Sequence, residues 1–256
     1  MTAQLSTLFD LTGQVALVTG ANGGIGQAIA IAMARAGADI AIAGQSDASE
    51  TAAAVRRCGR RAVDLRADLG TIGPVSTLVR DAVAMLGRVD ILVNNAGTIR
   101  RAEALQFSEE DWDVVMNVNL KSAFFLAQAA ARHMMETGRG GKIINIASML
   151  SFQGGIRVAS YTASKSALAG ITRLLANEWA GRGVNVNALA PGYIETRNTA
   201  ALRALRQRND EILARIPAGR WGTPEDIGGA AVFLASAAAR YVHGAVLPVD
   251  GGWLAR

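Results

Sequence analysis

The chain has 256 residues, of which 50% are hydrophobic and 18% are charged, a composition that excludes a disordered protein and suits one α/β domain with a buried core. Its single cysteine, Cys58, excludes an internal disulfide and has no Cys or His near it at metal-ligand spacing, so we expect no metal site. The net charge of +5 comes from scattered arginines rather than from one basic cluster, which favours a solvated arginine-rich surface over a nucleic-acid partner.

Seven short, β-rich apolar segments alternate along the chain with longer Ala-rich or amphipathic segments. The expected strands are QVALVTG (14–20), ADIAIAG (38–44), RAVDLRADL (61–69), VDILVNNAG (89–97), GGKIINIAS (140–148), GVNVNALAPG (183–192) and GAVLPVDGG (244–252). Helices are expected to begin near Gly24, Ala48, Pro74, Ser108, Ser160 and Pro224. This alternation predicts crossover helices on a parallel sheet, and the absence of a linker or repeat predicts one domain over residues 1–256. The predicted fold is a single-domain, Rossmann-type, doubly wound parallel sheet of about seven strands.

The first expected strand runs into TGANGGIG, residues 19–26, at a strand-to-helix turn. Gly20 permits the tight turn, Gly24 lets backbone N–H groups approach a pyrophosphate, and Gly26 lets the helix pack closely on the sheet. Many such turns are Gly-rich for geometry alone, but this one follows the first strand of a βαβ unit. The loop therefore predicts a dinucleotide site at this edge of the sheet.

The choice between the two dinucleotides depends on the end of the second strand, where an acid favours NAD and an arginine favours NADP. Gly44 and Gln45 stand there and carry neither marker, and Asp47 follows two residues later. We expect NAD as the cofactor, with NADP left open. Asp68 and Leu69 are expected at the adenine edge, and the small side chains of NNAG (94–97) suit a backbone that lies close to a ligand.

Tyr161 and Lys165 stand four residues apart in SYTASKS, so they share one face of the helix expected from Ser160. Ser148 ends the preceding strand at the ligand-binding edge of the sheet. Oxidation of an alcohol by a nicotinamide needs a group that takes the hydroxyl proton. A phenol that moves from a pKa near 10 to about 7 requires roughly 4 kcal/mol of phenolate stabilisation, and an ammonium one turn away contributes to it. We therefore expect a proton-transfer site rather than a structural tyrosine.

Together, TGANGGIG, NNAG, NVNL, Ser148, YTASK and PGYIET resemble the short-chain dehydrogenase/reductase family over essentially the whole chain. The resemblance implies that Tyr161 is the catalytic acid/base, that Lys165 lowers its pKa and binds the nicotinamide ribose, and that Ser148 positions the substrate. It also implies that Asn119 holds a water in a proton relay. The implied cofactor contacts are Gly20, Asn22, Gly24, Ile25, Gly26, Asp68, Leu69, Asn95, Ala96, Gly97, Tyr161, Lys165, Pro191, Gly192, Ile194 and Thr196.

Further stretches resemble the members of that family that oxidise sugar acids of the 2-deoxy-D-gluconate or 2-dehydro-3-deoxy-D-gluconate type: residues 96–113, 145–166, 216–222 and 249–256. This implies hydride transfer between NAD(H) and a secondary alcohol or ketone of a small deoxy sugar acid. Because a carboxylate needs a cationic partner, we expect Arg157, between Ser148 and Tyr161, to bind it; Arg100, Arg101 and Arg220 are weaker candidates. The polar, Arg-rich segment at about 193–216 predicts a helical substrate lid.

Two other functions stay open at this point: an NADP-dependent 3-oxoacyl carrier-protein or general ketone reductase, and a dinucleotide-sensing protein without turnover. The second is disfavoured because it is expected to lose Ser148, Tyr161 or Lys165. The resemblance also implies a homotetramer built with the helices from about Val114 and Ser160 and with the carboxyl end. No apolar run approaches the ~18 to 20 residues of a membrane span, and the first residues lack a signal-peptide core, so we expect a soluble, cytoplasmic protein without a membrane partner.

Overall fold

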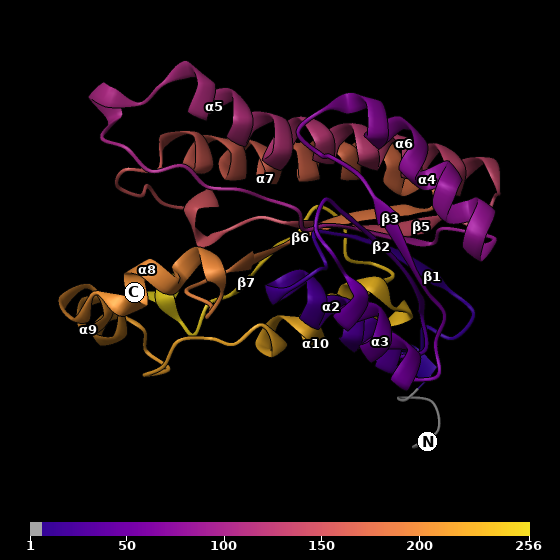
Figure 1. Cartoon of the computed structure of the whole chain (residues 1–256). Helices are drawn as coiled ribbons and strands as arrows, with labels where there is room; N and C mark the ends of the chain where they lie inside the picture. The colour runs from indigo at the N-terminus through magenta and orange to yellow at the C-terminus, as the bar shows by residue number, and fades with distance from the viewer. Residues whose placement is uncertain (1–6) are drawn as a thin grey trace.

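The computed structural model describes residues 7–256, within which seven strands form one parallel sheet in the order β3-β2-β1-β4-β5-β6-β7 (Figure 1). The strands are β1 Val15–Thr19, β2 Asp39–Gly44, β3 Ala62–Arg66, β4 Ile91–Asn94, β5 Gly141–Ile146, β6 Val184–Pro191 and β7 Val246–Val249. Each lies within a predicted segment, so the predicted single-domain, doubly wound parallel sheet is confirmed. The expected absence of a signal-peptide core rests partly on residues 1–6, which lie outside the described residues.

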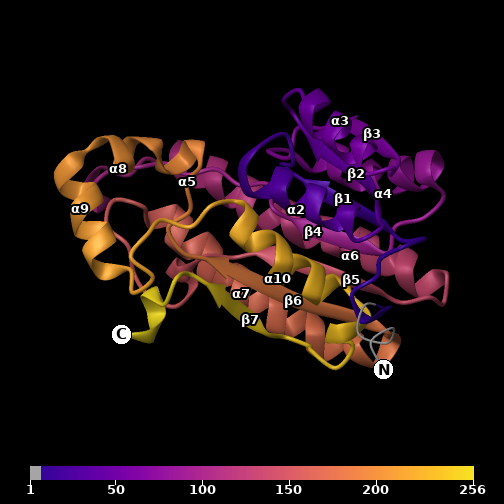
Figure 2. The same ribbon diagram turned by 90° about the horizontal axis from the view of Figure 1, so that it is seen from below.

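Helices cover both faces of the sheet, which is why strands such as β1 and β6 are mostly apolar and are buried along their whole length (Figures 1 and 2). One face carries α2 Gly24–Arg35, α3 Ser49–Arg57 and α10 Glu225–Ala235. The other carries α4 Ile72–Leu86, α5 Glu109–Met116, α6 Ser122–Glu136 and α7 Ala159–Trp179. Two short helices, α8 Ala200–Ala204 and α9 Arg206–Arg215, project beyond the sheet. None of the helices formed by residues 7–256 has both the length and the apolar character needed to cross a membrane.

Single turns of helix join several of these elements. The 3-10 turns are η1 Ala104–Gln106, η3 Met149–Ser151, η4 Ala180–Arg182, η5 Arg197–Thr199, η6 Ala237–Ala239 and η7 Trp253–Ala255. A π-helical turn, η2 Asn117–Lys121, continues α5 into α6. The sequence did not predict this turn, although π turns often accompany functional sites. It carries Asn119, one of the residues with an expected catalytic role.

Helix starts follow the local sequence. Before α5, the Ser108 hydroxyl accepts a hydrogen bond from the backbone N–H of Asp111 at 3.2 Å, which caps the helix as predicted. Helix α10 begins after Pro224, and Glu225 and Asp226 occupy its first turn, where acids face the positive end of the helix dipole.

The direction in which the sheet grows reverses at β1, which pairs with β2 on one side and with β4 on the other. The loops that follow β1 and β4 therefore diverge and leave a crevice at the carboxyl ends of the strands. Gly20 begins the first of these loops and Asn95 the second. Ser148 follows β5 and Gly192 follows β6, so the chain brings four predicted segments to one edge.

Candidate active site

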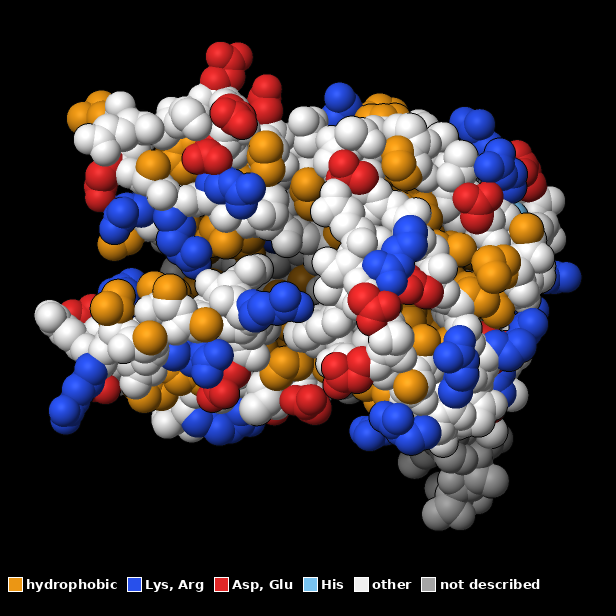
Figure 3. Space-filling view, viewed as in Figure 1, with side chains coloured by type: hydrophobic (Ala, Val, Ile, Leu, Met, Phe, Trp, Pro, Cys, Tyr) orange, Lys and Arg blue, Asp and Glu red, His pale blue; other side chains and the backbone are white. Residues whose placement is uncertain are grey.

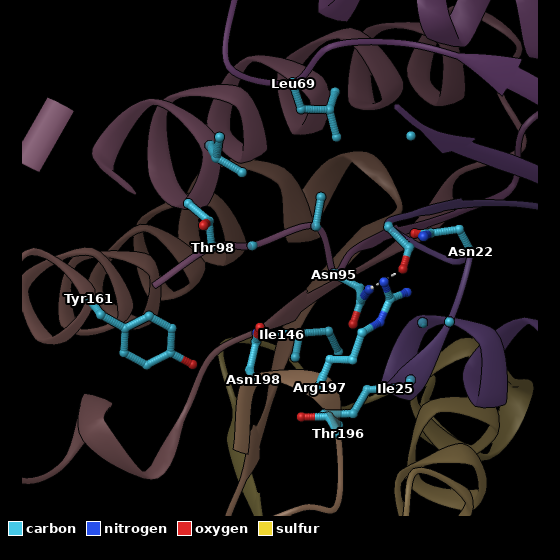
Figure 4. Close-up of a pocket in the computed structure, with 18 of the residues that line it drawn as sticks. Asn22, Ile25, Leu69, Asn95, Thr98, Ile146, Tyr161, Thr196, Arg197 and Asn198 are labelled. Carbon is cyan, nitrogen blue, oxygen red and sulfur yellow. Dashed lines mark hydrogen bonds between the residues drawn. The ribbon is translucent and has the colours of Figure 1, made fainter. Parts of the chain in front are cut away.

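A cavity of about 770 Å³ occupies this crevice, a size typical of small-molecule and cofactor sites. Figure 3 shows the cleft open between the α8–α9 side and the α5–α7 side of the molecule, with Lys and Arg side chains on both walls. All of the expected cofactor contacts line it, as do three of the expected catalytic residues, Ser148, Tyr161 and Lys165. Several of the labelled side chains point into it (Figure 4). Arg100 also lines the cavity, whereas Asn119, Arg101, Arg157 and Arg220 lie outside its lining.

The glycine loop is held against the loop that follows β4. The Asn95 side-chain amide donates to the carbonyl oxygens of Thr19 at 2.9 Å and Gly20 at 3.1 Å. Gly20 has a φ of +63°, and a Cβ there would lie 2.9 Å from the Ala96 Cα. A Cβ on Gly26 would lie 2.5 Å from the Gly20 carbonyl oxygen. Both positions therefore need glycine for packing within the protein.

Gly23 has no such internal reason to be glycine. Its φ of 176° is ordinary extended backbone, and the nearest atom to a Cβ placed there would be the Arg197 Nη2, at 3.5 Å. Helix α2 begins directly after it, with no side-chain cap and no acid in its first turn. Uncapped N–H groups at a helix start attract anions, and the missing side chain keeps the space in front of them open. This end of the cavity fits the diphosphate of a dinucleotide.

At the adenosine end of the cavity, within residues 7–256, no acid or arginine near the end of β2 is free to select between NAD and NADP. Gly44 and Gln45 line the cavity, and the Gln45 carbonyl accepts a hydrogen bond from Arg66 Nη1 at 3.1 Å. Asp47 is paired with Arg66 Nη2 at 2.9 Å. Asp68 also lines the cavity, and its Oδ1 accepts from the Gly70 backbone at 2.8 Å. The geometry is compatible with either NAD or NADP.

The pair predicted to carry out proton transfer, Tyr161 and Lys165, lies at the other end of the cavity, on α7. Lys165 is only 4% exposed, its Nζ lies 5.6 Å from the centre of the Tyr161 ring, and it donates to the Ile146 carbonyl at 2.5 Å. Burial lowers the pKa of the Lys165 ammonium from 10.5 to about 8. Leu168, Thr172 and Leu175, further along the same helix, are also buried. Tyr161 and Lys165 thus stand at the start of the inward face of α7.

Burial raises the pKa of the Tyr161 phenol, while a hydrogen bond with Ser148 and the charge of Arg101 act to lower it. The sequence predicts that Lys165 lowers the pKa of Tyr161, and no motif predicts the contribution from Arg101. The position of Arg101 depends on the long loop between β4 and α5, which motif spacing does not describe.

Ser148 and Asn119 are both buried but differ in what they contact. The Ser148 hydroxyl faces the cavity and accepts from the Leu150 backbone N–H at 3.1 Å. Asn119 binds both backbone groups of Thr98, with Oδ1 accepting at 2.8 Å and Nδ2 donating at 3.0 Å, and its Nδ2 also donates to the Ser164 hydroxyl at 3.2 Å. Asn119 therefore connects the loop after β4 to α7, next to the reacting pair. Its role in a proton relay stays a prediction.

Two of the four candidate substrate arginines are engaged in ion pairs away from the cavity. Arg220 makes two hydrogen bonds to Asp226, at 2.7 and 2.9 Å. Arg157, the first candidate from the sequence, is 58% exposed at its side chain and pairs with Glu103 at 3.2 Å. It is also the single non-glycine residue with positive φ, +63°, within residues 7–256. Its carbonyl accepts from the Ala102 N–H at 3.1 Å, so Arg157 fastens the loop that carries residues 101–103.

The other two arginines belong to that loop. Arg100 lines the cavity and pairs with Asp111 at 3.1 Å. Arg101 donates to the Asn198 carbonyl at 3.0 Å and has no ion pair among the described residues. Its charge acts to lower the pKa of Tyr161, although its side chain lies outside the cavity lining. Of the four arginines, Arg101 is the one that makes no ion pair within residues 7–256.

The segment expected to form a lid is helical in the structure, with η5, α8 and α9 in succession. An aromatic cluster contacts both the start and the end of this segment. The Tyr193 ring, at the start, lies 5.2 Å from Trp221 and 4.8 Å from Trp253, and Arg215, the last residue of α9, lies 4.1 Å from the Trp253 ring centre. Between them the segment borders the cavity through Ile194, Thr196, Arg197, Asn198 and Thr199, of which the sequence predicted Ile194 and Thr196 as cofactor contacts.

Comparisons with known proteins agree with this geometry. A family model described as enoyl-(acyl carrier protein) reductase, adh_short_C2, matches residues 20–254. The 2-dehydro-3-deoxy-D-gluconate 5-dehydrogenases of Dickeya dadantii and Escherichia coli are each 60% identical to the chain over 248 residues, which are 97% of this chain and 98% of theirs.

Solved structures of related proteins have closely similar folds. A proposed 2-deoxy-D-gluconate 3-dehydrogenase from Agrobacterium tumefaciens, with NADP bound, is 59% identical with a TM-score of 0.93, over 97% of this chain and 99% of that one. A gluconate 5-dehydrogenase from Burkholderia cenocepacia, in complex with NADP and tartrate, is 41% identical with a TM-score of 0.94, over 98% and 99% of the two chains.

Proposed function

Since the chain belongs to the short-chain dehydrogenase/reductase family, we propose that it transfers hydride between NAD(P)(H) and a secondary alcohol or ketone of a small deoxy sugar acid, of the 2-deoxy-D-gluconate or 2-dehydro-3-deoxy-D-gluconate type. The observation that carries the proposal is the placement of Ser148, Tyr161 and Lys165 on one cavity with the glycine loop. Relatives described as acting on a deoxy sugar acid are 60% identical, whereas a 3-oxoacyl carrier-protein reductase from Thermotoga maritima is 38% identical. The sugar acid is therefore favoured over an acyl thioester.

The bound nicotinamide supplies the hydride acceptor or donor, and Tyr161 holds the proton that moves with it. Because burial raises the pKa of the phenol, it is protonated at neutral pH, which suits donation to a ketone oxygen. In the oxidative direction the same oxygen must take a proton from the alcohol. The hydrogen bond with Ser148 and the charge of Arg101 stabilise the phenolate that this requires.

Lys165 contributes a second positive charge near the Tyr161 ring. With a pKa of about 8 its ammonium keeps its proton at pH 7 and loses it as the pH rises above that value. Its Nζ lies at the cavity wall beside the Ile146 carbonyl, within reach of a ribose hydroxyl that replaces this partner. We keep the assignment of Lys165 to ribose binding and to the support of Tyr161.

For the substrate carboxylate we place Arg101 ahead of Arg157. Arg101 has a charge that reaches Tyr161, and its one hydrogen bond within residues 7–256 is to a backbone carbonyl, that of Asn198. Arg157 is already paired with Glu103 and holds the neighbouring Ala102 in place. Arg157 then positions the loop, and Arg101 binds the acid as a charge-assisted donor.

The test of the proposed reaction is Tyr161→Phe, which removes the transferable proton and little volume. We expect turnover of 2-deoxy-D-gluconate with NAD or NADP to fall by a factor of about 100 to 10,000, the usual contribution of a general acid or base, with dinucleotide affinity within about twofold of wild type. Tyr241→Phe, at a side chain that is 95% exposed, is the matched control. A Tyr161→Phe enzyme that keeps more than about a tenth of the wild-type rate would contradict the assignment.

The assay panel also separates the alternative functions. Rates with 2-deoxy-D-gluconate, gluconate, an uncharged polyol and an acetoacetyl thioester are compared with each dinucleotide. Preference for the thioester would favour the 3-oxoacyl reductase instead. Dinucleotide binding without turnover of any member of the panel would favour a sensing protein.

We further infer a homotetramer in the cytoplasm, with α6 and α7 among the surfaces between copies. Phe125 on α6 and Leu174 on α7 turn outward and are 37% and 49% exposed, which suits helices that pack against another chain. Light scattering in solution tests the oligomer, and a monomer at micromolar concentration would reject it.

A further inference from the structure

One side chain of the lid enters the cofactor end of the cavity without a partner. Arg197, the first residue of η5, extends toward Asn95 and the glycine loop (Figure 4). Its Nη2 stands 3.5 Å from the position that a Cβ on Gly23 would take. Within residues 7–256 its guanidinium makes no hydrogen bond and no ion pair. A fully charged group with five donors thus lines the cleft beside uncapped N–H groups, with its side chain exposed to solvent.

The other charged side chains that line the cavity either lie away from the glycine loop or already have a partner. Lys165 lies at the reacting end and donates to the Ile146 carbonyl. Arg100 is paired with Asp111. Asp68, the one acid in the lining contributed by residues 7–256, is bound to the backbone of its own turn. Beside the glycine loop, the described part of the chain therefore offers one free cation, Arg197, and a helix start that has no acid in its first turn.

We propose that Arg197 binds the diphosphate of the dinucleotide and thereby closes the lid over it, an assignment that rests on the proposed function. The diphosphate carries two negative charges, and a planar guanidinium matches the geometry of phosphate oxygens. The start of α2 approaches the diphosphate from the sheet side, and Arg197 approaches it from the lid side. Two walls of the cavity then share one anion.

The residues on either side of Arg197 in the chain connect the proposed diphosphate site to the substrate side of the cavity. The Thr196 methyl lies 3.6 Å from the Cβ position of Gly24, on the glycine loop. The Asn198 carbonyl accepts a hydrogen bond from Arg101, which we assign to the substrate carboxylate. Three consecutive lid residues therefore reach the glycine loop, the diphosphate and the substrate arginine. Binding of the dinucleotide at Arg197 orders the segment that also holds Arg101.

The proposal is tested by dinucleotide binding, measured as quenching of tryptophan fluorescence or by calorimetry, with NADH and with NADPH. Arg197→Ala should weaken both by about 10- to 100-fold, the range for a lost hydrogen bond to a charged group, and Arg197→Lys should recover part of the loss. Affinity for adenosine, which has no phosphate, should be unchanged. Arg206→Ala, in the same segment at a side chain that is 96% exposed, is the matched control and should stay within about twofold of wild type.

Three outcomes of the binding experiment would contradict the proposal. Equal affinity of wild type and Arg197→Ala for both dinucleotides overturns the assignment, and so does a loss confined to NADPH, which would place the arginine at the ribose phosphate. Wild-type protein that binds neither dinucleotide overturns the proposed function together with it. As a readout independent of affinity, saturating NADH should slow hydrogen exchange of residues 196–205 in wild type but not in Arg197→Ala. Equal protection in both proteins also overturns the assignment.

Discussion

Replacing Lys165 with methionine tests whether the reacting lysine carries a buried charge at a cost to folding. Burial lowers its pKa from 10.5 to about 8, which corresponds to roughly 3 kcal/mol of destabilisation at pH 7. Below pH 8 the folded and the unfolded chain both carry the proton, so the folded state bears the whole cost of burying it. As the pH rises from about 8 toward 10.5, the folded chain has released its proton while the unfolded chain still holds one, and the cost disappears.

Methionine keeps the length of the side chain without a charge, so the Lys165→Met variant lacks this pH dependence. We expect the free energy of unfolding of the variant to exceed that of wild type by about 2 kcal/mol more at pH 7 than at pH 9.5, as measured by urea denaturation without dinucleotide. Packing differences between the lysine and methionine side chains affect both values alike, so they cancel in this comparison. Lys121→Met, at an exposed lysine, is the control. A difference from wild type that is the same at both pH values would refute the reasoning.

Two further sets of variants test the substrate side and the glycine loop. Arg101→Ala should raise KM for the sugar acid by about 10- to 100-fold while changing KM for an uncharged polyol little, and Arg157→Ala should raise KM for the sugar acid less. Initial rates with both substrates measure these KM values. A larger effect of Arg157→Ala than of Arg101→Ala would assign the carboxylate to Arg157 instead. Gly26→Ala should lower the free energy of unfolding by about 1 to 3 kcal/mol, because its Cβ would lie 2.5 Å from the Gly20 carbonyl oxygen. Gly73→Ala, in α4 with nothing within 4 Å of the added Cβ, should leave stability unchanged or raise it in the same urea experiment.

Much of the fold could be predicted because its signals are local. Continuous apolar runs such as Val15 to Val18 mark strands covered on both faces, and Ser108 caps its own helix within three residues. The cavity lining follows from the same pattern, because the carboxyl ends of parallel strands meet at one edge of the sheet. Residues that motifs place just after those strands, such as Gly20, Asn95 and Ser148, are therefore brought together without knowledge of any long-range contact.

The partners of the arginines could not be predicted in this way. Helices α5 and α6 and strand β5 separate Glu103 from Arg157 along the chain, and their pairing depends on how two loops meet above the sheet. The same holds for Arg101, whose effect on Tyr161 arises from its position in space and not from its spacing in the chain. Arg197 stands next to Thr196, a predicted contact, but only the path of η5 brings its exposed side chain beside the glycine loop.

The lid divides into a fixed part and a part that its ligands can order. Helix α9 buries Ile212 in a cluster with Trp221 and Trp253, whereas α8 buries no residue fully and packs only the partly buried Leu202 against the same cluster. The two helices meet at Leu205, which has extended rather than helical backbone angles. Because α9 is fastened to the body of the protein, ordering by a ligand has to act on the stretch before Leu205. Arg197 and Asn198 lie in that stretch, so the free energy that dinucleotide binding would supply there would act where Arg101, the arginine we propose for the substrate carboxylate, donates to the Asn198 carbonyl.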